Sequence, residues 1–128
     1  MLYSAAAVCT GACLGALLRW LIALLLNPLL NFISIGTLAA NLLGCYLAGV
    51  AIGLFLAYPG LNDRWGLLII TGFLGSLTTF SAFSIEMVTL LQQGLMMRSG
   101  GLIFLHVGGS VAMTFAGMAT FTFCSKYF

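Results

Sequence analysis

Charged side chains are scarce in this sequence: Lys, Arg, Asp and Glu together account for 5% of its 128 residues. A water-soluble domain carries about 25% charged residues, so this composition excludes one. The four Lys and Arg residues are scattered and form no basic patch, which excludes a nucleic-acid-binding protein. One His and two carboxylates leave little for acid–base chemistry, which argues against a soluble enzyme. With only two Pro beside sixteen Gly, the chain favours closely packed helices over disorder.

Apolar residues, by contrast, make up 62% of the chain, and the mean hydropathy is +1.21. They form four runs, at about 3–26, 33–57, 66–91 and 101–124, each long enough for the ~20 residues that a helix needs to cross a bilayer. The connections between the runs hold turn-forming residues and are short. Because the runs are continuous rather than alternating, they argue against a β-barrel. The sequence therefore predicts an all-α integral membrane protein, in which residues 1–128 form a single domain of four transmembrane helices.

The basic residues give this chain no clear orientation in the membrane. With four crossings, Arg64 and Lys126 share one side, and Arg98 and Arg19 belong to the other. Cytoplasmic loops normally carry the excess of Lys and Arg. A chain with two basic residues on each side of the membrane is expected to insert in both orientations, unless such small counts balance by chance. Insertion in both orientations favours an antiparallel two-fold dimer, since two-fold symmetry is the commonest in oligomers.

Small residues recur at four-residue intervals, which places them on one face of a helix. Such faces let two helix backbones approach closely and drive helix association in lipid. The pattern locates contacts between helices and identifies no substrate. Its members are Gly11 and Gly15 in the first run and Gly36, Ala40, Gly44 and Ala48 in the second, with Gly49 and Gly53 on a neighbouring face of the second.

The third run is unusual, because residues 71–84 hold two Gly and six Ser or Thr in the middle of a predicted membrane helix. Gly and adjacent Thr weaken a helix, and Ser and Thr hydroxyls compete for its backbone hydrogen bonds. The sequence therefore predicts a broken third helix, with the break near 75–79. Non-helical backbone is tolerated at this depth only where protein buries it or where it lines a cavity, and its free carbonyls can bind cations.

Polar side chains inside the other runs are further candidates for function, because each costs free energy unless it has a partner or a role. Arg19 either reaches outward to the interface or faces a water-filled vestibule that attracts anions. Asn41, one turn after Thr37, either joins helices or donates hydrogen bonds into a pathway. One face of the fourth run carries a polar row that is either an ion track or packing: His106, Ser110 and Thr114.

Two motifs identify a family. The second run contains Gly36-Thr37-Leu38-x-x-Asn41-Leu42-x-Gly44, and the third contains Gly72-Phe73-x-Gly75-x-x-Thr78-Thr79-Phe80-Ser81-x-Phe83-Ser84. Together they resemble the Fluc (CrcB-type) family of microbial fluoride channels, and the third-run motif is the more specific of the two. Gly11-x3-Gly15-Ala16-x2-Arg19 and His106-x3-Ser110 extend the resemblance over nearly the whole chain. One departure is Ala82, where family members commonly have Thr.

The resemblance implies an antiparallel, dual-topology homodimer with two pores, each lined by residues of both subunits. The broken third helices would meet at the centre of the dimer. There the backbone carbonyls of Gly75 and Thr78 from each subunit would hold a buried structural Na⁺. The matching Arg19 would lie near the aqueous vestibule.

In such a pore the matching phenylalanines, Phe80 and Phe83, would border the fluoride path. Asn41 and the Ser110 hydroxyl would contribute polar contacts. Ring edges carry the positive side of the aromatic quadrupole, and many moderate hydrogen-bond donors admit an anion without trapping it. The candidate path residues are Phe80, Phe83, Asn41, Ser110, Thr37, Ser81, Ser84 and Thr114.

The implied function is passive export of fluoride down its electrochemical gradient, through a multi-pass protein of the bacterial inner membrane. Its partners would be fluoride, membrane lipid and a second copy of the chain. A proton-coupled exporter of the small multidrug type is one alternative, but it needs an acid in its first helix, which here carries Arg19 instead. A non-transporting assembly subunit is the other. Glu86, the acid within the third run, is expected to bond a neighbouring helix, with proton handling as the alternative.

Overall fold

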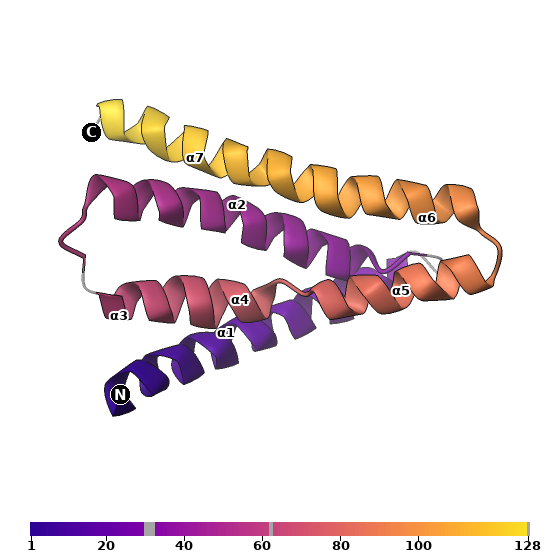
Figure 1. The fold of residues 1–128 in the computed structure, drawn as a ribbon, viewed down its shortest axis with the longest axis horizontal. Helices are drawn as coiled ribbons and strands as arrows, with labels where there is room; N and C mark the ends of the chain where they lie inside the picture. Colours follow the sequence, from indigo (N-terminus) through magenta and orange to yellow (C-terminus); the bar gives the residue numbers. More distant parts are fainter. Residues whose placement is uncertain (30–32, 62, 128) are drawn as a thin grey trace.

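The structure is a computed structural model that describes residues 1–29, 33–61 and 63–127, and it forms a bundle of long helices (Figure 1). Over these residues every regular element is helical. Four described segments are long and apolar enough to cross a membrane: Leu2–Leu29, Ile35–Ala57, Arg64–Gln92 and Met96–Tyr127. The N- and C-termini lie at the same end of the bundle, as an even number of crossings requires (Figure 1).

The first half of the chain folds as two long helices. Helix α1 (Leu2–Leu26) ends in a short 3-10 turn, η1 (Asn27–Leu29), and α2 (Ile35–Ala57) follows. The Asn27 side-chain oxygen accepts a hydrogen bond from the Gly36 N–H at 2.9 Å. This bond satisfies one of the backbone donors that a helix leaves unpaired at its N-terminus, and it joins the end of α1 to the start of α2.

The second half contains more irregular helices. The third segment is built from α3 (Asp63–Gly66), the π-helical η2 (Leu67–Leu74), α4 (Gly75–Leu77) and α5 (Phe80–Gln92). The fourth is built from α6 (Met96–Ile103), the π-helical η3 (Phe104–Gly108) and α7 (Gly109–Tyr127).

The fourth segment begins at Met96 rather than near 101, so the third connection is shorter than expected. Ser99, which the sequence placed in that connection, is 2% exposed and lies in the first turn of α6. Its hydroxyl donates to the Leu95 carbonyl at 3.1 Å. This bond satisfies the Ser99 hydroxyl within the helix. A polar residue can therefore be buried here without ending the helix.

Between α4 and α5 the backbone leaves the helical conformation for two residues. Thr78 has φ −81° and ψ 152°, and Thr79 has φ −147° and ψ 121°, so that both are extended. Figure 1 shows the resulting non-helical link between α4 and α5. The two residues belong to the 75–79 stretch in which the sequence predicts a break.

Glycines bring α2 and α7 into backbone contact. A Cβ at Gly49 of α2 would overlap the Thr114 carbonyl oxygen, and a Cβ at Gly117 of α7 would overlap that of Tyr46. The two helices therefore approach more closely than any larger residue would allow, as small residues permit in membranes. Gly11 of α1 and Gly72 of η2 make the equivalent contact on the other side of the bundle.

Replacing Gly49 by Ala should push α2 and α7 apart and lower the free energy of unfolding by about 1–3 kcal/mol, the usual cost of overpacking. Thermal unfolding of the purified protein in detergent, followed by Trp fluorescence, measures the change. Gly101→Ala is the matched control, because nothing lies within 4 Å of a Cβ at that position. Equal melting temperatures for the two variants would contradict the assigned contact.

Candidate functional site

A cavity of about 310 Å³ lies beside the break, between α2, α5, η3 and α7. Phe83, on its wall, is 6% exposed, whereas Phe80 is 76% exposed in this single chain. The cavity is therefore buried on one side and open on the other. Its lining includes Asn41, Thr79, Phe80, Phe83, His106 and Ser110.

The Asn41 side chain pairs with both backbone groups of Thr79. Its Oδ1 accepts the Thr79 N–H at 2.7 Å, and its Nδ2 donates to the Thr79 carbonyl oxygen at 3.0 Å. These groups have left the helical ladder, and an unpaired buried backbone group costs about 1–3 kcal/mol. Gly44, one turn after Asn41, makes the approach possible, because a Cβ there would overlap the Thr78 side chain. The motif of the second apolar run thus supplies both the amide that pairs with Thr79 and the glycine that leaves room for this pairing.

The break diverts donors from two backbone carbonyls. In a continuous helix the Gly75 carbonyl would accept from the Thr79 N–H, which here donates to Asn41. The Thr78 carbonyl would accept from the Ala82 N–H, which here donates to the Thr79 hydroxyl at 3.4 Å. The break therefore separates the Gly75 and Thr78 carbonyls from their helical donors.

Arg19 of α1 contacts the break from the other side. Its Nε donates to the Ser76 carbonyl oxygen at 2.9 Å, and its side chain is half-buried. In a continuous helix this carbonyl would accept from the N–H of Phe80, the first residue of α5. The guanidinium thus adds positive charge at the carboxyl end of the η2–α4 stretch, where the helix dipole is negative.

Helix α5 begins at the cavity, with Thr79 as its N-cap. The Thr79 hydroxyl accepts from the Ala82 N–H, so it satisfies one of the free donors of the first turn. The N-terminal end of a helix carries a partial positive charge. The cavity therefore lies at a helix end that favours an anion.

Three rings form a row along the cavity wall. The ring centroids of Phe80 and Phe83 are 5.4 Å apart, with 58° between their planes. Those of Phe83 and His106 are 4.7 Å apart, with 31° between their planes. Tilted rings at these distances place the positive edge of one ring near the negative face of the next. The remaining ring edges are free to face other groups.

The structure brings part of the candidate path together. Asn41, Phe80, Phe83 and Ser110 line the cavity, and Thr78 lines it with them. The remaining candidates are not among its lining residues, namely Thr37, Ser81, Ser84, Thr114, Arg19 and Gly75.

Hydroxyls outside the cavity are engaged locally. Those of Ser84 and Thr114 donate to carbonyls one turn back in their own helices, at 2.9 and 3.0 Å. The Ser81 hydroxyl lies 3.0 Å from that of Thr79. Because each hydroxyl has a single O–H, Ser84 and Thr114 can serve an anion only by turning away from these carbonyls.

Two residues of the site make contacts that the sequence does not predict. Thr79 carries the backbone groups that Asn41 binds, and no pattern in the neighbouring sequence indicated this pairing. His106 was assigned to a polar row on the fourth segment, and its stacking on Phe83 was not expected. Its four-residue spacing from Ser110 indicated a shared face, but not which helix that face contacts.

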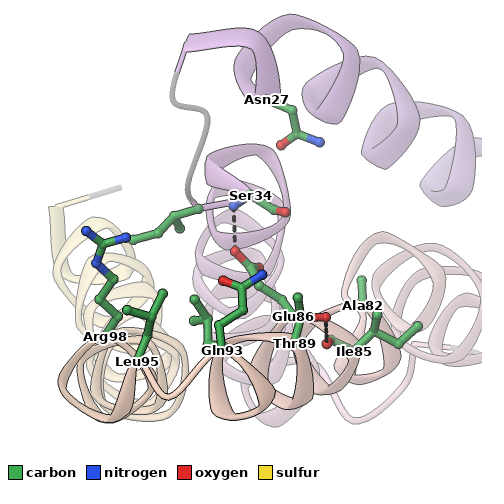
Figure 2. A pocket seen from close by; sticks show the side chains of 11 residues that line it. Asn27, Ser34, Ala82, Ile85, Glu86, Thr89, Gln93, Leu95 and Arg98 are labelled. Atoms are coloured by element: carbon green, nitrogen blue, oxygen red, sulfur yellow. Dashed lines mark hydrogen bonds between the residues drawn. The ribbon is translucent and has the colours of Figure 1, made fainter.

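Glu86 lies outside this cavity, next to a second one of about 570 Å³. Its Oε1 accepts from the Ser34 N–H, the N-cap of α2, at 2.7 Å. Figure 2 shows the carboxylate turned toward Ser34, with Arg98 of α6 elsewhere on the cavity wall. The expectation that Glu86 bonds the backbone of a neighbouring helix is confirmed.

A family model described as "CrcB-like protein, Camphor Resistance (CrcB)" matches residues 6–118. The chain belongs to the CrcB family. The match covers every candidate site residue, from Arg19 to Thr114, and it confirms the resemblance that the two motifs indicated. Membership of this family, together with four apolar spans, makes the chain a multi-pass membrane protein.

Curated relatives of this CrcB chain carry a functional name. A protein of Tolumonas auensis, "Fluoride-specific ion channel FluC", is 54% identical over 98% of this chain and 99% of its own length. Proteins with the same name from Pseudomonas putida and Haemophilus influenzae are 52% and 47% identical, over 98% and 91% of this chain and of their own lengths.

Replacing Asn41 by Leu should leave the Thr79 N–H and carbonyl unpaired and lower the free energy of unfolding by about 2–6 kcal/mol, at about 1–3 for each group. Asn41→Asp keeps an acceptor for the N–H and should cost less. Ser84→Ala, which removes a hydroxyl that donates to a carbonyl of its own helix, is the control. The melting temperature in detergent ranks the variants, and a Leu variant as stable as the control would refute the pairing.

Proposed function

We propose that this chain is a fluoride-selective ion channel that exports fluoride passively down its electrochemical gradient and so protects the cell from fluoride. The observation that carries the proposal is the cavity beside the break, where Phe80 and Phe83 meet Asn41 and Ser110. Relatives of matching length bear the name of a fluoride-specific channel. We place the chain in a bacterial inner membrane, as one channel domain spanning residues 1–128.

The chemistry of the cavity suits a small anion. Fluoride is strongly hydrated, so a selective path must replace its water with hydrogen-bond donors and positive ring edges. Phe80 and Phe83 offer ring edges, and the cavity lies at the positive end of α5. No Lys or Arg is among the described lining residues. An ion held by many moderate contacts can leave as well as enter, which conduction requires.

The path extends beyond the cavity in this proposal. Thr37, Ser81, Ser84 and Thr114 continue it along α2, α5 and α7, and their hydroxyls turn toward the ion as it passes. Arg19 stands near the vestibule, where its charge attracts anions from water, while its Nε holds the Ser76 carbonyl. Ala82 contributes no hydroxyl, so we expect it to affect the conduction rate rather than the fold.

The functional unit is an antiparallel, dual-topology homodimer in which each of two pores is lined by both subunits. The even balance of basic residues supports insertion in both orientations. The exposure of Phe80, 76% in a single chain, supports a path whose open side a second copy closes. Gly75 is exposed as well, which leaves its backbone accessible to a partner.

A structural Na⁺ at the centre of this dimer fits the chain. Sodium prefers oxygen ligands, and the break separates the carbonyls of Gly75 and Thr78 from their helical donors. These two carbonyls from each subunit would hold the ion, which would neutralise their converging dipoles. The Asn41–Thr79 pairing keeps the Gly75 carbonyl free for it, and the Thr79 N-cap does the same for the Thr78 carbonyl.

Efflux from liposomes tests the proposal. Vesicles loaded with potassium fluoride or potassium chloride and containing the purified protein should release fluoride rapidly and chloride not at all, as ion-selective electrodes report. Protein-free vesicles are the control. Absence of fluoride release from a verified dimer would overturn the proposed function.

Phe80→Ile and Phe83→Ile should each slow fluoride efflux at least about tenfold, the loss expected when about 1.4 kcal/mol of stabilisation disappears. Ile keeps the apolar bulk and removes the ring edges. Phe123→Ile on α7 is the matched control, since its ring contacts Tyr127 and is 65% exposed. Normal flux in both pore variants, measured in the same vesicles, would remove the rings from the path.

Dual topology predicts labelling from both sides of the membrane. We expect a single Cys introduced at Gly60, in a background without the four native Cys, to react with an impermeant maleimide partly in intact cells and fully after lysis. Gly60 lies in the second connection, and nothing lies within 4 Å of a Cβ there. Complete labelling or complete protection in intact cells would mean a single orientation.

A further inference from the structure

Arg19 belongs to a face of α1 that contacts the third segment. Gly11, Gly15 and Arg19 recur at four-residue intervals, so they share one face of the helix. A Cβ at Gly11 would overlap the Leu68 carbonyl oxygen, and a Cβ at Gly15 would overlap that of Phe73. The two glycines thus bring α1 against the backbone of η2. This close approach places Arg19 within reach of the backbone at the end of α4.

Ser76 of α4 contacts α1 through two of its atoms. Its hydroxyl lies 2.9 Å from the Ala12 carbonyl oxygen, and also 2.7 and 3.2 Å from those of Gly72 and Phe73 in its own segment. A hydroxyl has one O–H, so it donates to these three oxygens in turn rather than together. The Ser76 carbonyl oxygen, by contrast, accepts from Arg19 Nε at 2.9 Å. Arg19 therefore makes the attachment of Ser76 to α1 that does not depend on the hydroxyl.

This attachment determines how the last turn before the break is rotated. Helix α4 is three residues long, and the backbone that follows it at Thr78 is extended, so its own ladder restrains it little. Successive residues of a helix are rotated by about 100° around its axis. Ser76 is half-buried against α1, whereas Gly75 is exposed in the single chain. The turn therefore has one side held by Arg19 and an open side that carries Gly75.

We propose that Arg19 is a positioning residue for the structural Na⁺: its bond to the Ser76 carbonyl holds the last turn before the break in the rotation that presents the Gly75 carbonyl to the open side. The same bond withholds the Ser76 carbonyl from the ion, so it determines which oxygen of the turn is offered. This role rests on the proposed function, in which Gly75 and Thr78 hold the ion, and it adds a residue that does not touch the ion.

An Arg that acts only through its charge has a different effect on sodium. A fixed positive charge repels a nearby cation, so any variant that removes the charge would bind Na⁺ more tightly. Two uncharged variants would then gain equally, whatever hydrogen bonds they make. A positioning bond predicts a difference between them, because only a variant with a donor can hold the Ser76 carbonyl.

Arg19→Gln and Arg19→Met form the matched pair. The amide nitrogen introduced by Arg19→Gln stands as many bonds from Cα as the Arg19 Nε that donates in this structure, so this variant keeps the donor and loses the charge. Arg19→Met has a similar length and keeps neither the donor nor the charge. Arg98→Met is the control, because it removes the same charge from α6, on the wall of the second cavity.

Sodium-dependent stabilisation of the full-length dimer measures the affinity without a flux measurement, because an ion that binds only the folded protein raises its melting temperature. NaCl replaces N-methylglucamine chloride at constant ionic strength, and the midpoint of the rise reports the apparent affinity. We expect Arg19→Met to need about tenfold more sodium than Arg19→Gln, the loss expected when a carbonyl loses its donor. Arg98→Met should leave the midpoint unchanged.

Equal sodium midpoints for Arg19→Gln and Arg19→Met would overturn the inference and leave the sodium site in place. Absence of any sodium response in the unchanged chain would overturn both. Fluoride efflux by the unchanged chain is scored separately, so a failed channel is distinguishable from a failed role of Arg19.

Carbonyl ¹³C resonances of the unchanged protein give a second test that needs no variant to fold. We expect the Gly75 and Thr78 signals to shift saturably with NaCl, while the Ser76 signal, whose oxygen is bonded to Arg19, stays in place. A Ser76 signal that shifts as far as that of Gly75 would show that this carbonyl is not withheld from the ion, and it would overturn the inference.

Discussion

The pairing of the Asn41 side chain with the Thr79 backbone is the interaction on which the rest of the site depends. Hydrocarbon offers no hydrogen bonds, so a membrane helix can be interrupted only where other protein groups satisfy the freed backbone. Asn41 satisfies the N–H and the carbonyl of one extended residue together, from a helix 38 residues away in sequence. Without it, the third segment would gain by closing into a continuous helix.

Three consequences follow from that pairing. The Gly75 carbonyl loses its helical donor, the Thr79 N–H, to Asn41, and the adjacent N-cap takes the Ala82 N–H from the Thr78 carbonyl. Helix α5 starts anew at Phe80, with its positive end and its two phenylalanine rings at the cavity. The same amide nitrogen also lies 3.1 Å from His106 Nδ1, which ties the fourth segment to the break. Glycine packing makes all of this possible, because Gly44 admits the Thr78 side chain against α2.

Local sequence was sufficient for part of this architecture. Uninterrupted apolar runs predict the four spans, since length and hydropathy alone decide whether a helix can cross a bilayer. The cluster of Gly, Ser and Thr in 71–84 predicts weakened helix, and the extended residues Thr78 and Thr79 lie there. The two motifs identified the family that the comparisons confirm.

The contacts between segments could not be predicted in the same way. Periodicity places His106 on a face, but it does not say that Phe83 and Asn41, on two other helices, meet that face. Arg19 was interpreted through its charge, whereas its contact with the Ser76 carbonyl depends on where the break falls. The start of the fourth segment was missed because Ser99 is polar yet buried, with its hydroxyl bonded inside the helix. Each case depends on a partner distant in sequence or on a backbone bond that composition does not encode.

Amide hydrogen exchange at Thr79 measures the central claim most directly. The Thr79 N–H lies outside the helical ladder, so a side chain alone protects it in this account. Exchange should be slow in the unchanged protein and at least about a hundredfold faster in Asn41→Leu, which corresponds to ~2.7 kcal/mol of lost protection, while helical amides of α7 keep their rates. Equal exchange at Thr79 in the two proteins would contradict the claim that Asn41 holds the break open.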